Sequence, residues 1–158
     1  MKIYLTPRFY IALLRMMIGL IFLTAAYSNW ENGYYSEEGL HRFFSEVFPQ
    51  SQNPFGWYAQ FINTTILPIA STFSIFLVYS EVLMGVALLG GILTPIISVG
   101  AMIFIMNTFL AIFGQDWPWS YIMIDAILFT VIATQSGRTL GIDGLLARRF
   151  GTRRWYLW

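Results

Sequence analysis

The sequence contains no cysteine and a single histidine, His41, among its 158 residues. Iron–sulfur clusters need cysteine thiolates and bis-histidine haem sites need two histidines, so the chain supplies neither ligand set. Structural zinc sites require several cysteine or histidine ligands, and no metal site is expected. His41 stands next to Arg42, which favours a surface position over a role as a ligand. We expect no intrinsic metal or cofactor, no phosphate-binding loop and no nucleic-acid partner.

Charged residues are also scarce. They make up 11% of the chain, whereas hydrophobic residues make up 57% and the mean hydropathy is +0.62. A soluble domain usually carries about 25% charged residues. The apolar residues fall into four blocks of about the 17–25 residues that a transmembrane helix needs. We therefore predict an all-α integral membrane protein with one domain, 1–158, built as a four-transmembrane-helix bundle in the lipid bilayer. The predicted spans are 9–29, 69–92, 95–114 and 118–136.

The few charges are distributed unevenly. Lys2, Arg8 and Arg15 lie near the N-terminus, whereas the connection between the first two spans is mainly acidic. Five arginines follow the last span: Arg138, Arg148, Arg149, Arg153 and Arg154. By the positive-inside rule, both termini are predicted to be cytoplasmic and the long connection to lie outside.

The outer connection contains apolar residues at helical spacing. Leu40, Phe43, Phe44, Val47 and Phe48 follow the i, i+3, i+4, i+7, i+8 pattern. We predict short amphipathic helices in the segment 36–66, which serve either as simple lids on the bundle or as a cap over a pocket or docking face.

A further short amphipathic helix is predicted at the C-terminus. It contains Leu145, Leu146 and Phe150, and Asp143 is placed to cap its start.

Four polar residues interrupt the predicted spans, one in each: Arg15, Glu81, Asn107 and Asp125. Ionisable groups at membrane depth are costly, so they usually face the interior of a bundle and pair there. Depths counted along the helices predict two pairs, Arg15 with Glu81 and Asn107 with Asp125. Two explanations of these polar residues remain open. They either fix the packing of the helices, or they bind a polar headgroup within the bundle, in which case Glu81 and Asp125 exchange protons with it.

Three stretches resemble the DoxX/DoxD family of small four-span bacterial and archaeal membrane proteins. They are "LLRMMIGLIFLTAAY" in the first span, "YSEVLMGVALLGGILTP" across the second and "QSGRTLGIDGLL" after the fourth. Arg15, Glu81 and the region of Arg138 and Asp143 carry the resemblance. Many relatives have a lysine at the end of the first span, where this chain has Asn29. The resemblance implies a prokaryotic cytoplasmic membrane. The long outer connection is similar to the DoxD branch, which is associated with thiosulfate:quinone oxidoreductase.

The resemblance and the buried polar groups lead to two functional hypotheses. The first is a membrane subunit of a quinone-linked oxidoreductase. Glu81 and Asp125 would be its catalytic groups, and Arg15, Asn107, Trp117 and Trp119 would bind the quinone. Its partners would be other membrane subunits and an external electron donor. The alternative is a non-catalytic accessory or assembly subunit of a respiratory or photosynthetic complex. A cavity beside Glu81 would favour the first hypothesis, whereas a solid interior would favour the second. A small-solute transporter is less well supported, because no inverted repeat is evident.

Overall fold

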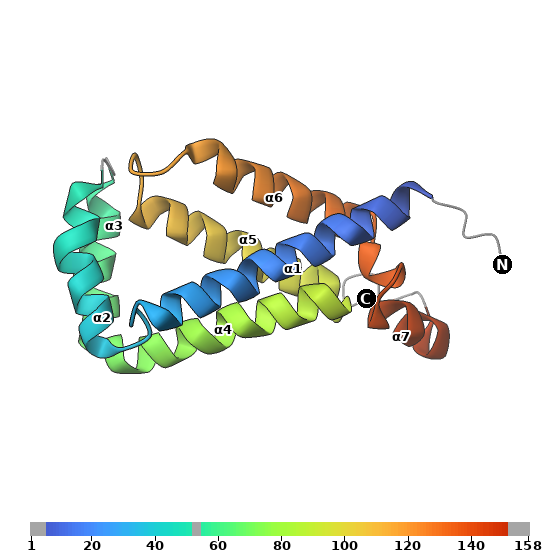
Figure 1. Cartoon of the computed structure of the whole chain (residues 1–158), viewed down its shortest axis with the longest axis horizontal. Coiled ribbons are helices and arrows are strands. Elements are labelled where there is room, and N and C mark those ends of the chain that lie inside the picture. The colour runs from blue at the N-terminus through green and yellow to red at the C-terminus, as the bar shows by residue number, and fades with distance from the viewer. Residues whose placement is uncertain (1–5, 52–54, 152–158) are drawn as a thin grey trace.

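The computed structural model describes residues 6–51 and 55–151 (Figure 1), and these residues form helices and no strands. Four long helices make up the bundle: α1 (Pro7–Glu31), α4 (Ala70–Gly90), α5 (Thr94–Ala111) and α6 (Pro118–Ala133). Lys2, Arg153 and Arg154, which contributed to the predicted orientation, lie outside the described residues.

The helices agree with the predicted all-α membrane class. Three helical runs are long and apolar enough to cross a membrane: α1, α5 and the run Gly56–Gly90 that ends in α4. The fourth, α6, is apolar but has 16 residues. At about 1.5 Å per residue it is about 24 Å long, somewhat less than the ~30 Å hydrocarbon core of a bilayer. The described part of the chain therefore has three helical runs of full spanning length and a fourth, shorter helix.

The bundle is held by close packing of α1 on α4 and of α5 on α6. Glycines allow the first of these contacts, since a Cβ atom on Gly19 would lie only 2.8 Å from the Gly85 carbonyl oxygen. Small residues of this kind let membrane helices approach closely. The apolar core between the helices consists of Ile18, Phe22, Met84, Leu88, Ala101, Ile105 and Leu128.

The predicted amphipathic segment lies across one end of the bundle (Figure 1). It contains α2 (Glu37–Arg42) and α3 (Gly56–Phe61), each continued by a π-helical turn, Phe43–Val47 and Ile62–Ile66 respectively. Short 3-10 turns, Phe48–Gln50 and Leu67–Ile69, follow these two π-helical turns. Ser36 caps α2 by accepting a hydrogen bond from the Gly39 amide. This cap is the N-terminal arrangement that serine favours.

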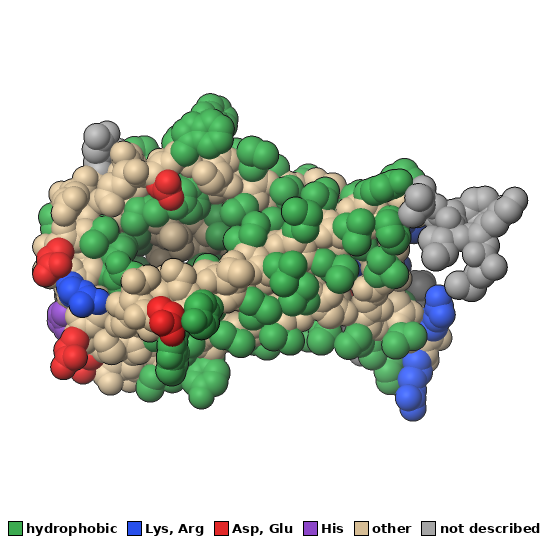
Figure 2. All heavy atoms as spheres, viewed as in Figure 1, with side chains coloured by type: hydrophobic (Ala, Val, Ile, Leu, Met, Phe, Trp, Pro, Cys, Tyr) green, Lys and Arg blue, Asp and Glu red, His purple; other side chains and the backbone are tan. Residues whose placement is uncertain are grey.

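The opposite end contains a 3-10 turn, Ser136–Arg138, and α7 (Ile142–Phe150). The described chain begins and ends here (Figure 1). Figure 2 shows mainly acidic side chains at the α2–α3 end, where Arg42 and His41 also lie, basic ones at the α7 end and apolar ones between. This separation of charge follows the sequence pattern, and the assignment of the α7 end to the cytoplasm stays a prediction.

Asp143 does not cap α7, contrary to the prediction. It lies inside that helix, and Gly141 occupies the N-cap position. Its carboxylate instead accepts hydrogen bonds from the amides of Leu93 at 2.7 Å and Thr94 at 2.8 Å, at the start of α5. The α7 segment folds back on the bundle, and this places the Asp143 carboxylate against the unpaired amides at the start of α5 rather than those at the start of α7.

Candidate functional site

Glu81 lies on α4 with 3% of its surface exposed, close to the α2–α3 end. Its carboxylate accepts a hydrogen bond of 3.2 Å from the Asn29 amide nitrogen on α1. It accepts a second one from the hydroxyl of Tyr35, in the turn between α1 and α2. The three side chains therefore form a polar cluster, which we call the Glu81 cluster.

Tyr35 is the hydroxyl hydrogen-bond donor of this cluster. Burial raises the pKa of the Tyr35 phenol above its ordinary value, and the hydrogen bond to Glu81 raises it further. The phenol consequently keeps its proton at neutral pH and can donate it to the carboxylate in a hydrogen bond.

The predicted pair of Arg15 with Glu81 is wrong. Arg15 is fully buried, and its guanidinium donates to four backbone carbonyls instead. The bonds reach Leu88 at 2.8 Å, Ser136 at 2.7 Å, Thr139 at 3.3 Å and Leu140 at 2.9 Å. Leu88 lies seven residues beyond Glu81 on α4, about 10 Å along the helix. Arg15 therefore holds the α7 end of the fold together.

A cavity of about 460 Å³, the central cavity, reaches the Glu81 cluster from inside the bundle. Phe22, Leu77 and Phe104 contribute apolar walls, and Leu40 and Phe44 close it at the α2–α3 end. The amphipathic segment is therefore a cap over a pocket, which was one of its two predicted roles. Further polar groups around the cavity come from Asn107, Thr108, Ser120 and Tyr121.

The central cavity has an opening on the side of the bundle. Its lining includes Ile21 and Ala25 of α1 together with Tyr121 and Ile124 of α6. Figure 2 shows the surface hollowed between these two helices, next to the α2–α3 end. Ile21 is itself exposed. The central cavity is therefore open to the surroundings of the bundle on this side.

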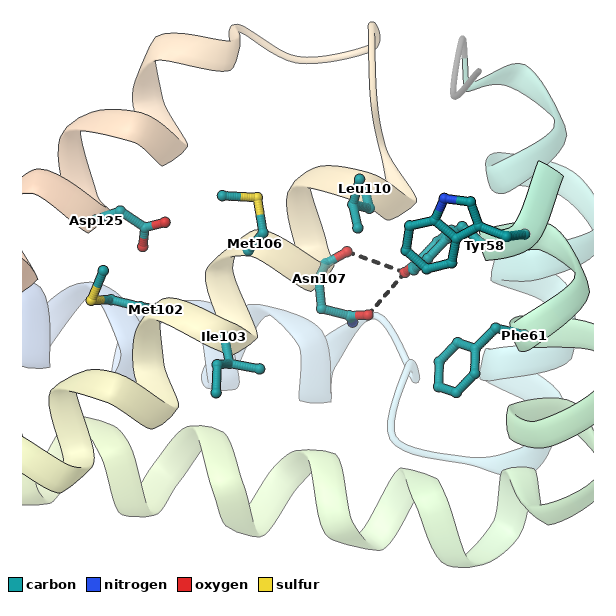
Figure 3. Close-up of a pocket in the computed structure, with 9 residues that line it drawn as sticks. Tyr58, Phe61, Met102, Ile103, Met106, Asn107, Leu110 and Asp125 are labelled. Carbon is teal, nitrogen blue, oxygen red and sulfur yellow. Dashed lines mark hydrogen bonds between the residues drawn. The ribbon is translucent and has the colours of Figure 1, made fainter. Parts of the chain in front are cut away.

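A second cavity, of about 470 Å³, lies on the other side of α5. We call it the Asp125 groove; its lining is Trp57, Tyr58, Phe61, Met102, Ile103, Met106, Asn107, Leu110 and Asp125 (Figure 3). Asn107 borders both cavities.

The predicted pair of Asn107 with Asp125 shares this groove without a hydrogen bond. The Oδ1 atom of Asn107 accepts a bond of 3.0 Å from the Tyr58 hydroxyl on α3. The Oδ1 atom of Asp125 is buried and has no hydrogen-bond partner. Figure 3 shows the Asp125 carboxyl beside the methionines of α5, at the opposite end of the groove from the Tyr58–Asn107 pair.

The two tryptophans predicted to bind the quinone, Trp117 and Trp119, border neither cavity. Trp117 is 65% exposed and Trp119 is 56% exposed, at the start of α6. Such positions suit the aromatic belt at a membrane interface. The structure thus brings Glu81 and Asn107 to the central cavity, places Asp125 in the separate groove, and leaves Arg15, Trp117 and Trp119 outside both.

Sequence reasoning missed three residues of these sites: Asn29, Tyr35 and Tyr58. Asn29 attracted attention only as the replacement of a family lysine, yet that position faces Glu81. Tyr35 and Tyr58 lie in stretches that resembled ordinary interfacial segments. Asn29 lies four residues, about one helical turn, beyond Ala25, which also borders the cavity. Their shared face of α1 was the available signal.

Within residues 6–51 and 55–151, no group of three or more His, Asp or Glu side chains is arranged to hold a metal ion. The polar groups around the central cavity are instead hydrogen-bond donors and acceptors, and Glu81 supplies the carboxylate among them.

Comparison with known families identifies the chain. No curated protein and no solved structure matches it. The model of the DoxX family matches residues 10–114, which include Arg15, Asn29, Glu81 and Asn107 but not Asp125. The match covers about two thirds of the sequence and contains the central cavity's main helices, so the protein belongs to the DoxX family of membrane proteins.

Proposed function

We propose that this protein is a DoxD-like membrane subunit of a quinone-linked oxidoreductase, and that the central cavity binds the quinone headgroup beside Glu81. The observation that carries the proposal is the cavity itself, which has a volume of about 460 Å³ and ends at a buried carboxylate. Ligand pockets in proteins are commonly about 300–1,000 Å³, mostly apolar, with a few polar groups that fix orientation.

The chemistry of the lining supports a quinone rather than a purely apolar ligand. A quinone headgroup supplies carbonyl oxygens that accept hydrogen bonds and, once reduced, hydroxyl groups that donate them. Asn29 and Tyr35 offer donors, and Glu81 offers an acceptor or, when protonated, a donor. We assign Glu81 the exchange of protons with the ligand, and Asn29 and Tyr35 the positioning of its carboxylate.

The structure changes the roles proposed for the other residues. Arg15 does not border the cavity, and its guanidinium donates hydrogen bonds to backbone carbonyls instead. We therefore assign it no contact with the ligand. Asn107 borders the central cavity and remains a binding residue in the proposal. Electrons are proposed to come from an external donor subunit, since the sequence lacks ligands for an iron–sulfur cluster or a bis-histidine haem.

A non-catalytic accessory subunit was expected to have a solid interior. The central cavity, its lateral opening and the carboxylate at its end all weigh against that alternative.

Quinone binding by the purified full-length protein tests the proposal. We expect quenching of intrinsic fluorescence by a soluble short-chain quinone, and a loss of affinity of about tenfold or more in Glu81→Gln, because a buried charged acceptor is removed. Tyr35→Phe should weaken binding less, and Tyr34→Phe, which changes a neighbouring wall residue without a hydrogen bond to Glu81, serves as the matched control. Failure of the wild-type protein to bind quinone, together with unchanged quinone reduction by membranes carrying Glu81→Gln, would refute the proposal.

A further inference from the structure

The Asp125 groove is a second candidate site, separate from the central cavity. It lies between α3 and the pair α5–α6, on the outside of the bundle (Figure 3). Several of its side chains are largely exposed, among them Ile103 at 68% and Trp57 at 60%. The groove is therefore open to whatever surrounds the bundle in the membrane.

Asp125 is the polar group of this groove that lacks a partner. Its Oδ1 atom is buried without a hydrogen bond, whereas Tyr58 and Asn107 bond to each other. Ionisable side chains within a span are costly and normally pair with another group. The isolated chain leaves one carboxyl oxygen unsatisfied, so the groove is incomplete without a molecule that brings a hydrogen-bond donor.

The depth of Asp125 in the membrane limits which kind of molecule can bring a hydrogen-bond donor to it. It lies seven residues into α6, about 10 Å below the start of that helix. Phospholipid headgroups stay at the interface, so their donors lie too far from this carboxyl. A lysine or arginine on a neighbouring transmembrane helix can occupy this depth, where charges of opposite sign pair.

A second copy of the chain does not supply such a residue from its described part. Arg15 is the basic residue buried within the bundle there, and it is already bonded to four carbonyls. The other described arginines belong to the ends of the fold: Arg8 at the start of α1, Arg42 in α2, Arg138 before α7, and Arg148 and Arg149 within it.

The rest of the lining fits a protein partner. Met102 and Met106 border the groove beside Trp57 and Phe61. Aromatic residues and methionine are enriched at protein interfaces, and the flexible methionine side chain adapts to an irregular partner surface.

We propose that the Asp125 groove is the docking surface for a transmembrane helix of a different subunit, and that this helix carries a lysine or arginine that pairs with Asp125. The inference does not depend on quinone binding in the central cavity, and it identifies the partner by its chemistry: an apolar helix with one basic residue near mid-membrane.

Site-specific photo-crosslinking in native membranes tests the proposal on the full-length protein. A benzophenone amino acid replaces Met106 inside the groove, and in a matched control it replaces Leu83, which is 60% exposed on α4 and borders neither cavity. We expect a protein adduct from position 106 and none of the same size from position 83. Mass spectrometry of the adduct should identify a membrane protein with a lysine or arginine in the crosslinked span.

Substitutions of Asp125 then test the charge pair. Asp125→Asn should lower the yield of the position-106 adduct at least about tenfold, because truncating one member of a buried charge pair weakens an interface strongly. Asp125→Glu should retain it. If Asp125→Asn lowers the amount of folded protein, the exchange of charges, Asp125→Lys with the partner's basic residue changed to Asp, should restore the adduct.

Four results would overturn the proposal. They are an adduct with lipid alone, an adduct with a second copy of the chain, a partner span without a basic residue, and an adduct whose yield is unchanged in Asp125→Asn.

Discussion

At the residue scale, Arg15 and Asp143 stabilise the same end of the fold. Arg15 contacts the C-terminal end of α4, and Asp143 contacts the N-terminal end of α5. Arg15 donates to Leu88 in the last turn of α4, where the helix dipole is negative. Asp143 accepts from Leu93 and Thr94 at the start of α5, where the dipole is positive. Both charges are therefore placed where a helix end favours their sign.

We predict that Arg15→Met lowers the stability of the protein by about 3 kcal/mol or more, because carbonyls of four residues lose their buried donor. Thermal unfolding of the detergent-solubilised protein measures the loss. The exposed Arg8, on the same helix, provides the control, and Arg8→Met should leave the unfolding temperature nearly unchanged. Equal stability of both variants would contradict the role assigned to Arg15.

The partners of Arg15 show where prediction from residue types ends. The residue was identified as buried and paired, since a charge within a span has few alternatives. Its partners are main-chain carbonyls. Every residue has such a carbonyl, so the identity of the side chains gave no indication of which residues Arg15 would contact. Glu81 was likewise predicted to be buried, but its donors, Asn29 and Tyr35, come from a helix end and a turn whose approach depends on the fold.

At the element scale, the contact between α1 and α4 depends on two small residues. Gly19 and Gly85 face each other so closely that a Cβ atom on Gly19 would lie 2.8 Å from backbone atoms of α4. This contact brings Asn29, further along α1, beside Glu81 on α4. Close helix packing thus positions two members of the candidate site.

Gly19→Ala should destabilise the bundle by roughly 1–3 kcal/mol, since a methyl group there forces the helices apart. Gly100→Ala is the matched control, because nothing lies within 4 Å of a Cβ atom at that position of α5. There the better helix propensity of alanine should make the protein equally or slightly more stable. Chemical or thermal unfolding in detergent checks both, and a neutral Gly19→Ala would show that the crossing tolerates more separation.

The attachment of α7 can be tested separately. Asp143→Ala removes the acceptor for two amides of α5, and we expect a loss of about 1–2 kcal/mol, similar to the loss of a helix cap. Loosening of α7 should also speed tryptic cleavage at Arg148 and Arg149. Asp143→Asn, which keeps one acceptor oxygen, should fall between the wild type and Asp143→Ala. An unchanged cleavage rate in both variants would argue against the contact.

At the scale of the whole molecule, acidic residues predominate over Arg42 at the α2–α3 end of an apolar bundle, and arginines predominate at the α7 end (Figure 2). The α2–α3 end contains Glu37, Glu38 and Glu46, and the α7 end contains Arg148 and Arg149. This asymmetry underlies the proposal that the α7 end faces the cytoplasm.

The natural absence of cysteine makes this orientation directly measurable. Glu37→Cys and Arg148→Cys each introduce a single thiol at opposite ends of the fold. A membrane-impermeant maleimide added to intact cells should label Glu37→Cys and spare Arg148→Cys. Inside-out vesicles should reverse the pattern, and the unaltered protein controls for background. Labelling of Arg148→Cys in intact cells would place the α7 end outside.

The sequence alone determined the class of this protein: an apolar, helical, membrane-embedded chain of the DoxX family, with polar side chains buried in its spans. The helical membrane class follows from composition and periodicity, which are local and survive any arrangement of the helices, whereas the family follows from the motifs and the matching family model. Only the tertiary structure decided which buried groups meet. Glu81 pairs with Asn29 and Tyr35, Arg15 pairs with backbone carbonyls, and Asp125 has its own groove. Such contacts depend on rotation and crossing of helices far apart in the chain, where a shift of one residue turns a side chain by about 100°.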